Sequence, residues 1–225
     1  MGFNGVDHLI ENKLEGGLHS GKLIQALLKK VQGLGVQVLT GISVNGYTKI
    51  KNKILVDTSY APIQTRQLLL CTNAFTKELI PGIDIVTNRG QVLITNPIKN
   101  LKIKGTFHFD KGYYYFRNLG SRLLLGGARN SAFEQENTLE MDITAGIQEK
   151  LEKFIHEYLL PDISFYITDR WSGIMAMGTE KLPIVQELDD NIFCCVRMSG
   201  MGVALAPVAA QEAAQLIRSA LKKIR

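Results

Sequence analysis

The chain has 225 residues, enough for one large domain or two small, interleaved domains with a sizeable core. Hydrophobic residues make up 45% and charged residues 21% of it, which excludes a disordered chain and a coiled coil. The net charge of +5 weakly favours an anionic ligand, but the basic residues are scattered and have few aromatic neighbours. We therefore expect no nucleic-acid partner.

The sequence carries no sign of a membrane or secretory protein. No apolar run approaches the roughly 18 residues of a membrane span, and the first residues lack the basic and apolar regions of a signal peptide. The cysteines Cys71, Cys194 and Cys195 have no metal-ligand spacing, and neither do the histidines. We expect buried thiols, no metal site and a cytoplasmic location.

The first third of the chain predicts one helix followed by strands. Residues 20–33 form the predicted helix, whose apolar residues recur at helical spacing: Leu23, Ile24, Leu27, Leu28 and Val31. A strand is predicted over residues 36–40 directly after it. Three further strands are predicted over residues 43–50, 54–59 and 63–71, separated by polar turns.

The middle third predicts an antiparallel sheet and a long helix. Residues that favour strands gather between turns over 85–95, 112–117 and 122–128. A helix is predicted over residues 143–158, because apolar side chains recur there on one face and Pro161 lies just beyond the end. The last third then returns to a mixed α/β pattern.

A strand, a glycine turn and a helix follow one another near the end of the chain. Residues 191–198 are predicted to form a buried strand, Gly200 and Gly202 a tight turn, and residues from Val203 a helix. A helix N-terminus offers free N–H groups and a partial positive charge, and glycine allows a ligand to approach the backbone. The pattern is typical of ligand sites, and also of α/β proteins that bind nothing there.

Several catalytic motifs are nearly present, but none is complete. Residues 16–23 differ by one position from the phosphate-binding loop G-x-x-x-x-G-K-[ST], and Leu23 at that position cannot bind magnesium. No G-x-S-x-G elbow occurs, and Gly33 and Gly35 lack the third glycine of G-x-G-x-x-G. A nucleoside triphosphatase and a serine hydrolase are therefore not supported.

A series of short segments, taken in order, resembles a known family. They are Gly17 to Leu23, Gly35 to Val38, Leu69 to Ala74, Arg89 to Val92, Tyr113 to Arg117, Leu125 to Gly127, Trp171 to Ile174, Leu182 to Ile184 and Ser199 to Pro207. No single segment is specific, but their order is similar to the FAD-dependent D-amino-acid oxidase, glycine oxidase and sarcosine oxidase group. The resemblance covers the chain from about Gly5 to about Leu221.

This resemblance implies a mixed fold of α/β and α+β character, in which an antiparallel-sheet substrate domain is inserted into part of an FAD-binding domain. Residues 1–19 would form an edge of the substrate domain and residues 83–168 its main part. Residues 20–82 and 169–225 would belong to the FAD-binding domain.

One part of the family pattern is missing from this sequence. Family members begin with a βαβ unit whose G-x-G-x-x-G motif holds the pyrophosphate, and this chain resembles the two-thirds that follow it. An N-terminal partner segment could carry that loop. The chain would then be a truncated product or one subunit of a split oxidase. Alternatively it is a non-catalytic binding or interaction module.

The resemblance also implies a set of cofactor-binding residues. They are Val44 on the adenine side and, beside the flavin ring, Met198, Ser199, Gly200, Met201, Gly202, Val203 and Ala204. The covalent members of the group carry a flavin-linking cysteine near the position of Met175, and none is present here. The implied cofactor is therefore non-covalent FAD.

The implied reaction is oxidation of the C–N bond of an amine or amino acid by hydride transfer to the flavin, which requires no catalytic acid or base. Arg117 matches the arginine that binds the substrate carboxylate, and Tyr113 and Tyr115 would line the same site. Two positions depart from the family. Gly200 and Met175 stand where many relatives have an arginine, which predicts weaker carboxylate binding.

Overall fold

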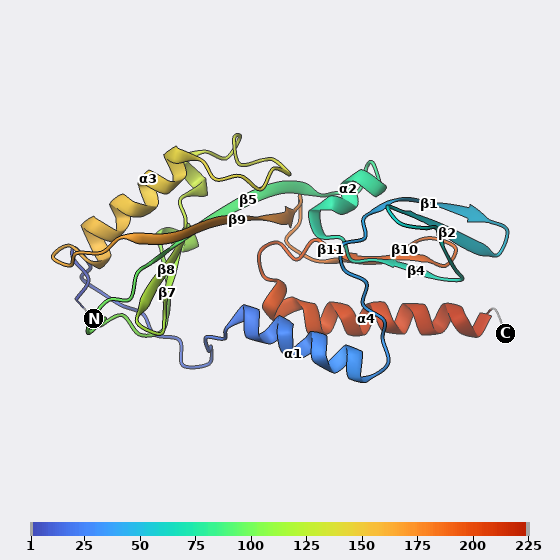
Figure 1. Cartoon of the computed structure of the whole chain (residues 1–225), viewed down its shortest axis with the longest axis horizontal. Helices are drawn as coiled ribbons and strands as arrows, with labels where there is room; N and C mark the ends of the chain where they lie inside the picture. The colour runs from blue at the N-terminus through green and yellow to red at the C-terminus, as the bar shows by residue number, and fades with distance from the viewer. Residues whose placement is uncertain (1, 224–225) are drawn as a thin grey trace. The chain divides into compact units, whose positions relative to one another are not determined.

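The structure is a computed structural model that describes residues 2–223. The chain forms two compact units (Figure 1). Unit 1 comprises the residues up to Leu18 together with Thr87–Ile174, and unit 2 comprises His19–Val86 together with the residues from Met175. Both units mix helices with strands, so the fold is the mixed α/β and α+β architecture expected from the sequence.

Unit 1 is built on a five-stranded sheet with the strand order β6-β7-β8-β5-β9. The strands are β5 (Val86–Thr95), β6 (Thr106–Phe109), β7 (Tyr114–Leu119), β8 (Arg122–Gly127) and β9 (Ile167–Met177). The pairs of β7 with β6 and β8, and of β5 with β8, are antiparallel. The predicted antiparallel sheet is therefore confirmed.

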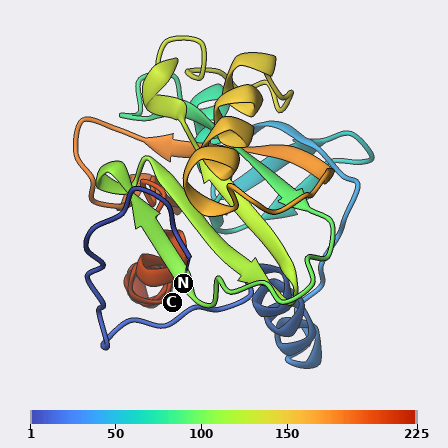
Figure 2. The ribbon, with the colours of Figure 1, turned by 90° about the vertical axis from the view of Figure 1, so that its left-hand side faces the viewer.

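One face of this sheet is covered by helix α3 (Ala145–Phe154), which continues into a π-helical turn, Ile155–Leu159 (Figure 2). Apolar side chains of the sheet and the helix form the core of unit 1, among them Leu123, Leu125, Leu151 and Phe154. The helix predicted over residues 143–158 is confirmed, with its apolar face buried as its spacing requires.

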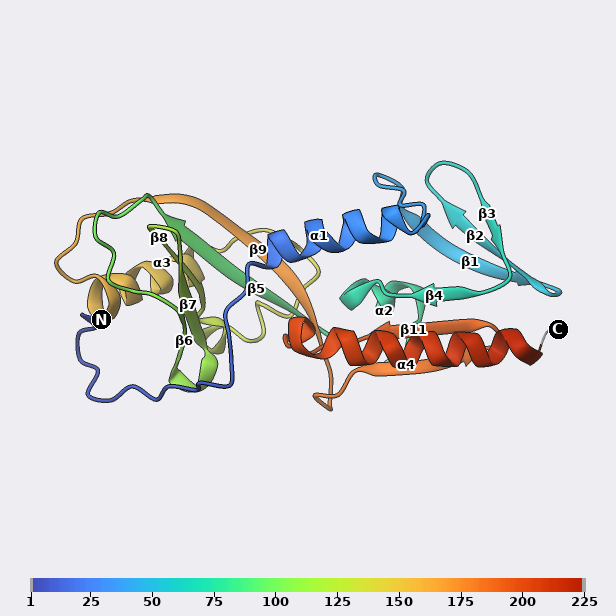
Figure 3. The ribbon, with the colours of Figure 1, turned by 90° about the horizontal axis from the view of Figure 1, so that it is seen from below.

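Unit 2 contains two smaller sheets and a long helix. The first is the meander β1 (Val44–Ile50), β2 (Lys53–Thr58) and β3 (Ile63–Thr65). The second has the order β10-β11-β4, from β4 (Leu68–Leu70), β10 (Ile184–Asp189) and β11 (Ile192–Val196), with β11 parallel to β4. Helix α4 (Gly202–Lys223) packs along β10 and β11 (Figure 3). The predicted strand, glycine turn and helix are all present.

Short helices connect these strands. They are η1 (Asn73–Phe75) and α2 (Thr76–Leu79) in unit 2, and η2 (Asp110–Gly112) and η3 (Arg129–Ser131) in unit 1.

Two strand predictions were wrong in unit 2. The strand predicted over residues 63–71 is two strands in different sheets, because the chain turns where the Thr65 hydroxyl donates to the carbonyl of Gln67 at 2.8 Å. The strand predicted over residues 36–40 does not form. A strand needs a hydrogen-bonding neighbour, and no strand among residues 2–223 pairs with this segment.

Helix α1 (Ser20–Gly33) was predicted correctly but buries none of its residues. Most of its apolar side chains remain open, with Ile24 63% exposed, and so does the following segment, where Leu39 is 60% exposed. A helix with an apolar stripe normally packs that stripe against another element. Within the described part of the chain, α1 has no such partner.

The cysteines only partly match the expectation of buried thiols. Cys194 is buried and Cys195 half-buried, but Cys71 is an exposed residue because it lies just beyond the end of β4. Surrounding atoms nevertheless desolvate its thiol, and together with the neighbouring Cys195 they raise the pKa of Cys71 to about 11. In residues 2–223, no helix is both long and apolar enough to cross a membrane.

Candidate functional site

The connection between β11 and α4 has an unusual backbone. Arg197, Ser199 and Gly200 have φ angles of 61°, 50° and 77°, in the left-handed region that residues other than glycine rarely adopt. Such conformations cost about 1–3 kcal/mol each and persist only where the surroundings enforce them. They often mark ligand sites, and this turn contains four of the eight residues that the family resemblance assigns to the cofactor.

The side chain of Arg197 holds this turn in place. Its Nε donates to the carbonyl oxygen of Leu182 at 2.9 Å, and its Nη1 donates to the carboxylate of Asp84. The backbone and hydroxyl of Thr179 also donate to Asp84. These bonds from Thr179, and then the Arg197 guanidinium, hold the pKa of Asp84 below its usual range. The carboxylate therefore stays ionised, and its bond with Arg197 restrains the start of the turn.

Helix α4 begins directly after the turn and presents a free N-terminus. The oxygen of Met201 accepts hydrogen bonds from the amides of Ala204 and Leu205. The amides of Gly202 and Val203 have no acceptor among residues 2–223. The first turn also lacks acidic residues. Unpaired amides and the helix dipole together favour a negatively charged or electron-rich group.

One buried polar atom in the turn has no partner. The Ser199 Oγ is the only buried side-chain nitrogen or oxygen without a hydrogen bond in the described part of the chain. Leaving such an atom unpaired costs about 1–3 kcal/mol, a cost that a bound ligand can remove. A flavin ring edge carries both carbonyl and N–H groups, so the Ser199 hydroxyl and the α4 amides fit the group that the family resemblance implies.

Val44, the remaining predicted cofactor residue, lies elsewhere in unit 2. It is the first residue of β1, opposite Thr58, and its side chain is partly exposed. The strand is irregular between Val44 and Gly46. Its backbone pairing is with β2 and not with the turn before α4, so its role stays a prediction.

The predicted substrate residues all lie in unit 1, around strand β7. Tyr115 and Arg117 alternate with the core residue Phe116, so they lie on the sheet face away from α3. Tyr113 precedes the strand in a helical conformation. The guanidinium of Arg117 donates to two backbone carbonyls, those of Leu18 and Asn118.

Sequence reasoning missed one cationic residue, Arg129, beside Tyr113 and Tyr115. The Arg129 guanidinium lies 4.8 Å above the ring centre of Phe133 and donates to the Asn88 side chain. Its charge acts on the hydroxyls of Tyr113 and Tyr115. The sequence did contain one signal for this residue: Arg129 follows the glycine pair that ends β8 by two positions.

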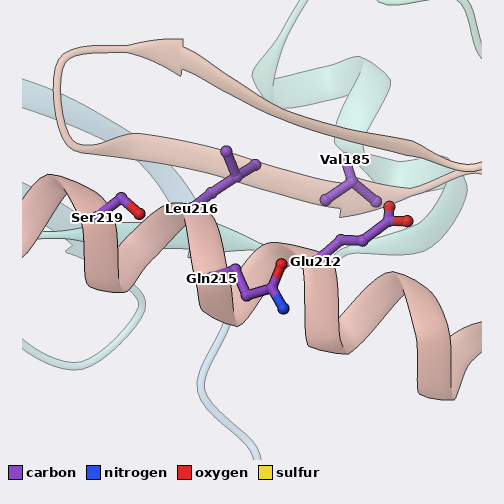
Figure 4. A pocket seen from close by; sticks show the side chains of 5 residues that line it. All are labelled: Val185, Glu212, Gln215, Leu216 and Ser219. Carbon is purple, nitrogen blue, oxygen red and sulfur yellow. The ribbon is translucent and has the colours of Figure 1, made fainter.

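A shallow hollow of about 410 Å³ lies between α4 and β10 (Figure 4). Its lining residues are Val185, Glu212, Gln215, Leu216 and Ser219. None of the predicted site residues borders it, and it has no buried unpaired polar group to orient a ligand. It therefore does not contribute to the candidate site.

Comparisons with solved structures identify related folds. The chain is similar to L-proline dehydrogenase from P. horikoshii (TM-score 0.74, 22% identity, 88% of this chain and 55% of that chain). It is also similar to glycine oxidase from Geobacillus kaustophilus (TM-score 0.73, 19% identity, 88% of this chain and 53% of that chain). A third similar structure is fructosyl amine:oxygen oxidoreductase from Aspergillus fumigatus (TM-score 0.72, 14% identity, 90% of this chain and 52% of that chain). At these identities the likeness establishes the fold.

The chain spans about half the length of these solved structures. No curated protein sequence matches it. The model of the family described as FAD dependent oxidoreductase, however, matches residues 5–216, which is nearly the whole chain. The match includes both units, the strained turn and the start of α4. The chain therefore belongs to the family of FAD-dependent oxidoreductases.

Proposed function

We propose that this protein oxidises the C–N bond of an amine or amino acid, with non-covalent FAD held by unit 2 and the substrate by unit 1. The observation that carries the proposal is the buried, unpaired hydroxyl of Ser199 in a strained turn that leads into the free N-terminus of α4. The amino-compound oxidoreductases among the similar structures support this reaction class. The free thiols support the cytoplasmic location predicted from the sequence.

The chain's own residues have a clear division of labour in this proposal. FAD, when bound, supplies the acceptor for a hydride from the substrate carbon. Ser199 and the amides of Gly202 and Val203 would hold the electron-rich edge of the ring, where the helix dipole favours added negative charge. Residues of unit 1 bind and orient the substrate. No side chain needs to act as an acid or base.

We further propose that a partner segment with the G-x-G-x-x-G motif completes the cofactor site. The motif is absent from these 225 residues, and the chain spans about half the length of its structural neighbours. The open apolar face of α1 and the unpaired residues 36–40 support this proposal, since a βαβ segment offers an apolar helix face and a strand edge. The segment could belong to the same longer protein or to another chain.

The test is FAD retention after gel filtration, followed by visible absorption. The chain alone is expected to lose the flavin, and the chain combined with a G-x-G-x-x-G segment encoded upstream is expected to keep it. Gly202→Asp should reduce retention by the combined protein, because a carboxylate would face the electron-rich ring edge. Retention by the chain alone overturns the need for a partner. A colourless combined protein overturns the cofactor assignment and favours a non-catalytic module.

Arg117 provides a separate prediction for the substrate. If Arg117 binds a substrate carboxylate as the family resemblance implies, Arg117→Leu in a flavin-loaded preparation should raise the apparent KM for carboxylated amines by about tenfold or more. The KM for amines without a carboxylate should not change. Steady-state kinetics measures both, and an unchanged KM for the carboxylated amines excludes this role.

A further inference from the structure

The arginines of unit 1 fall into two groups. Arg89 is buried and makes a two-pronged contact with Glu136, with both N–O distances 2.9 Å. Arg170 contacts Glu152 at 2.7 Å. Arg129, like Arg117 and Arg122, is half-buried and has no carboxylate within ion-pair distance among residues 2–223. A desolvated cation without a directly paired anion is unfavourable, and Glu136, which is paired with Arg89, acts on the charge of Arg129 only from beyond ion-pair distance.

The backbone presents Arg129 in a fixed position. Strand β8 ends in Gly127 with φ 127° and is followed by Ala128 with φ 60°, which turns the chain sharply. The amide of Ala128 donates to the carbonyl of Tyr113 at 2.9 Å, and the amide of Ala132 donates to the carbonyl of Arg129, also at 2.9 Å. The first bond ties the start of the short helix to Tyr113, and the second closes the helical turn on which Arg129 stands.

The far side of the same loop is also anchored. The buried carboxylate of Glu136 accepts from Arg89 and, at 3.0 Å, from Gln91. Its carbonyl accepts from the amide of Arg89 at 2.7 Å. Residues 129–136 are therefore tied to β5, whose Asn88 accepts from the Arg129 guanidinium. A preorganised cation of this kind binds an anion with little loss of conformational freedom.

Arg129 also has aromatic neighbours, Tyr113, Tyr115 and Phe133. The rings of Tyr113 and Phe133 meet edge to face with centroids 6.1 Å apart. Burial raises the pKa of Tyr115, so its hydroxyl stays neutral at physiological pH. Burial lowers the pKa of Arg129, while Tyr113 and Glu136, which is paired with Arg89, raise it. The ordinary pKa of arginine is so high that the side chain stays charged at physiological pH. The cluster is thus a cation with flat apolar walls.

We propose that Arg129 is an anion-binding residue of unit 1, which takes a small carboxylate whose flat or aromatic body packs against Phe133 and Tyr113. The guanidinium matches a carboxylate in its planar, two-pronged geometry. This site is additional to the role predicted for Arg117. This proposal rests on the proposed function in one respect, since the ligand would be the substrate. The substrates would then be carboxylated amines with a bulky flat group.

To test this proposal, the full chain is titrated with benzoate and with benzamide, and binding is followed by ligand-observed NMR. Benzamide has a similar shape to benzoate but no charge. Benzoate is expected to bind at least about tenfold more tightly than benzamide, because a charge-assisted contact is replaced by a neutral one. Arg129→Gln should remove this difference, and Arg129→Lys should keep part of it. Arg122→Gln is the matched control, since Arg122 bonds to Thr168 at 3.0 Å on the same sheet.

Two results would overturn the proposal. One is an unchanged preference for benzoate in Arg129→Gln, and the other is a preference that Arg117→Gln alone removes. The fluorescence of Trp171, the one tryptophan, verifies that unit 1 of each variant is folded. No flavin enters this experiment. If the protein combined with the G-x-G-x-x-G segment fails to hold FAD while the chain still selects benzoate through Arg129, the cofactor assignment is contradicted and the Arg129 site remains supported.

Discussion

Replacing Glu136 with glutamine is expected to lower the free energy of unfolding of unit 1 by about 3–5 kcal/mol, the usual cost of breaking a buried ion pair. The side chains of Arg89 and Glu136 are only 5% and 1% exposed. Removing the negative charge leaves the Arg89 guanidinium uncompensated in the interior. Urea unfolding followed by the fluorescence of Trp171 measures this loss, because Trp171 lies in unit 1.

The exposed pair Lys153 and Glu157 provides the control. Its atoms are 3.6 Å apart at helical i,i+4 spacing, with both side chains largely open to water. Glu157→Gln should change the stability by no more than about 0.5 kcal/mol. A second variant, Arg89→Met with Glu136→Leu, should be more stable than Glu136→Gln, because it leaves no unpaired charge. Equal losses for Glu136→Gln and Glu157→Gln would refute the role of the buried pair.

Glu136 should also make the free energy of unfolding of unit 1 depend on pH. Burial by itself would raise the pKa of Glu136, but the hydrogen bonds from Arg89 and Gln91 outweigh it, and the pKa lies below its ordinary value. The stabilisation is therefore present above the unfolded pKa, about 4.3, and is lost as the pH falls through the folded pKa. The stability of Glu136→Gln should fall less steeply over this acid range.

The sequence predicted those elements whose residues carry their own periodicity. The helix α3 repeats its core residues at helical spacing, and the strands β5, β7 and β8 are runs of strand-favouring residues between turns, so these patterns are visible without knowing the partner. The turn before α4 was predicted from the glycines Gly200 and Gly202, and Gly200 does adopt a positive φ. Local chemistry was sufficient in each case.

The errors and omissions depended on distant contacts. Residues 36–40 have strand-forming side chains, but no neighbouring strand is among the described residues. The break at Thr65 sends two short strands into separate sheets, which no local pattern encodes. The buried network around Glu136 joins β5 to a loop 45 residues further along the chain. Arg129 was missed because its position over Phe133 and beside Tyr113 and Tyr115 is a property of the folded unit.

The glycine at the end of β8 controls both the stability of unit 1 and the position of Arg129. A Cβ at Gly127 would lie 2.9 Å from the carbonyl carbon of Tyr113 and from the Cα of Tyr114, both backbone atoms that cannot move aside. The φ of 127° is also strained for any side chain. Gly127→Ala is expected to destabilise unit 1 by about 3 kcal/mol or more, as strain of about 1–3 kcal/mol and overlap add together.

Two other glycines separate these contributions. Gly120 has a φ of 61° and open space around it, so Gly120→Ala should cost only the left-handed conformation, about 1–2 kcal/mol. Gly146 lies in α3 without close neighbours or a positive φ, so Gly146→Ala should stabilise by about 0.5–1 kcal/mol. Urea unfolding ranks the three variants, and equal losses at Gly127 and Gly120 would contradict the backbone overlap.

The Gly127 variant also tests how Arg129 is positioned. The overlap would push β8 away from Tyr113 and break the bond from the Ala128 amide that starts the loop of Arg129. Under conditions where Gly127→Ala is still folded, its preference for benzoate over benzamide should therefore fall, although the guanidinium remains in the chain. Gly120→Ala should retain the preference. If the Gly127 variant keeps the whole preference for benzoate over benzamide, Arg129 binds anions without the fixed turn. Its charge alone is then sufficient for anion binding.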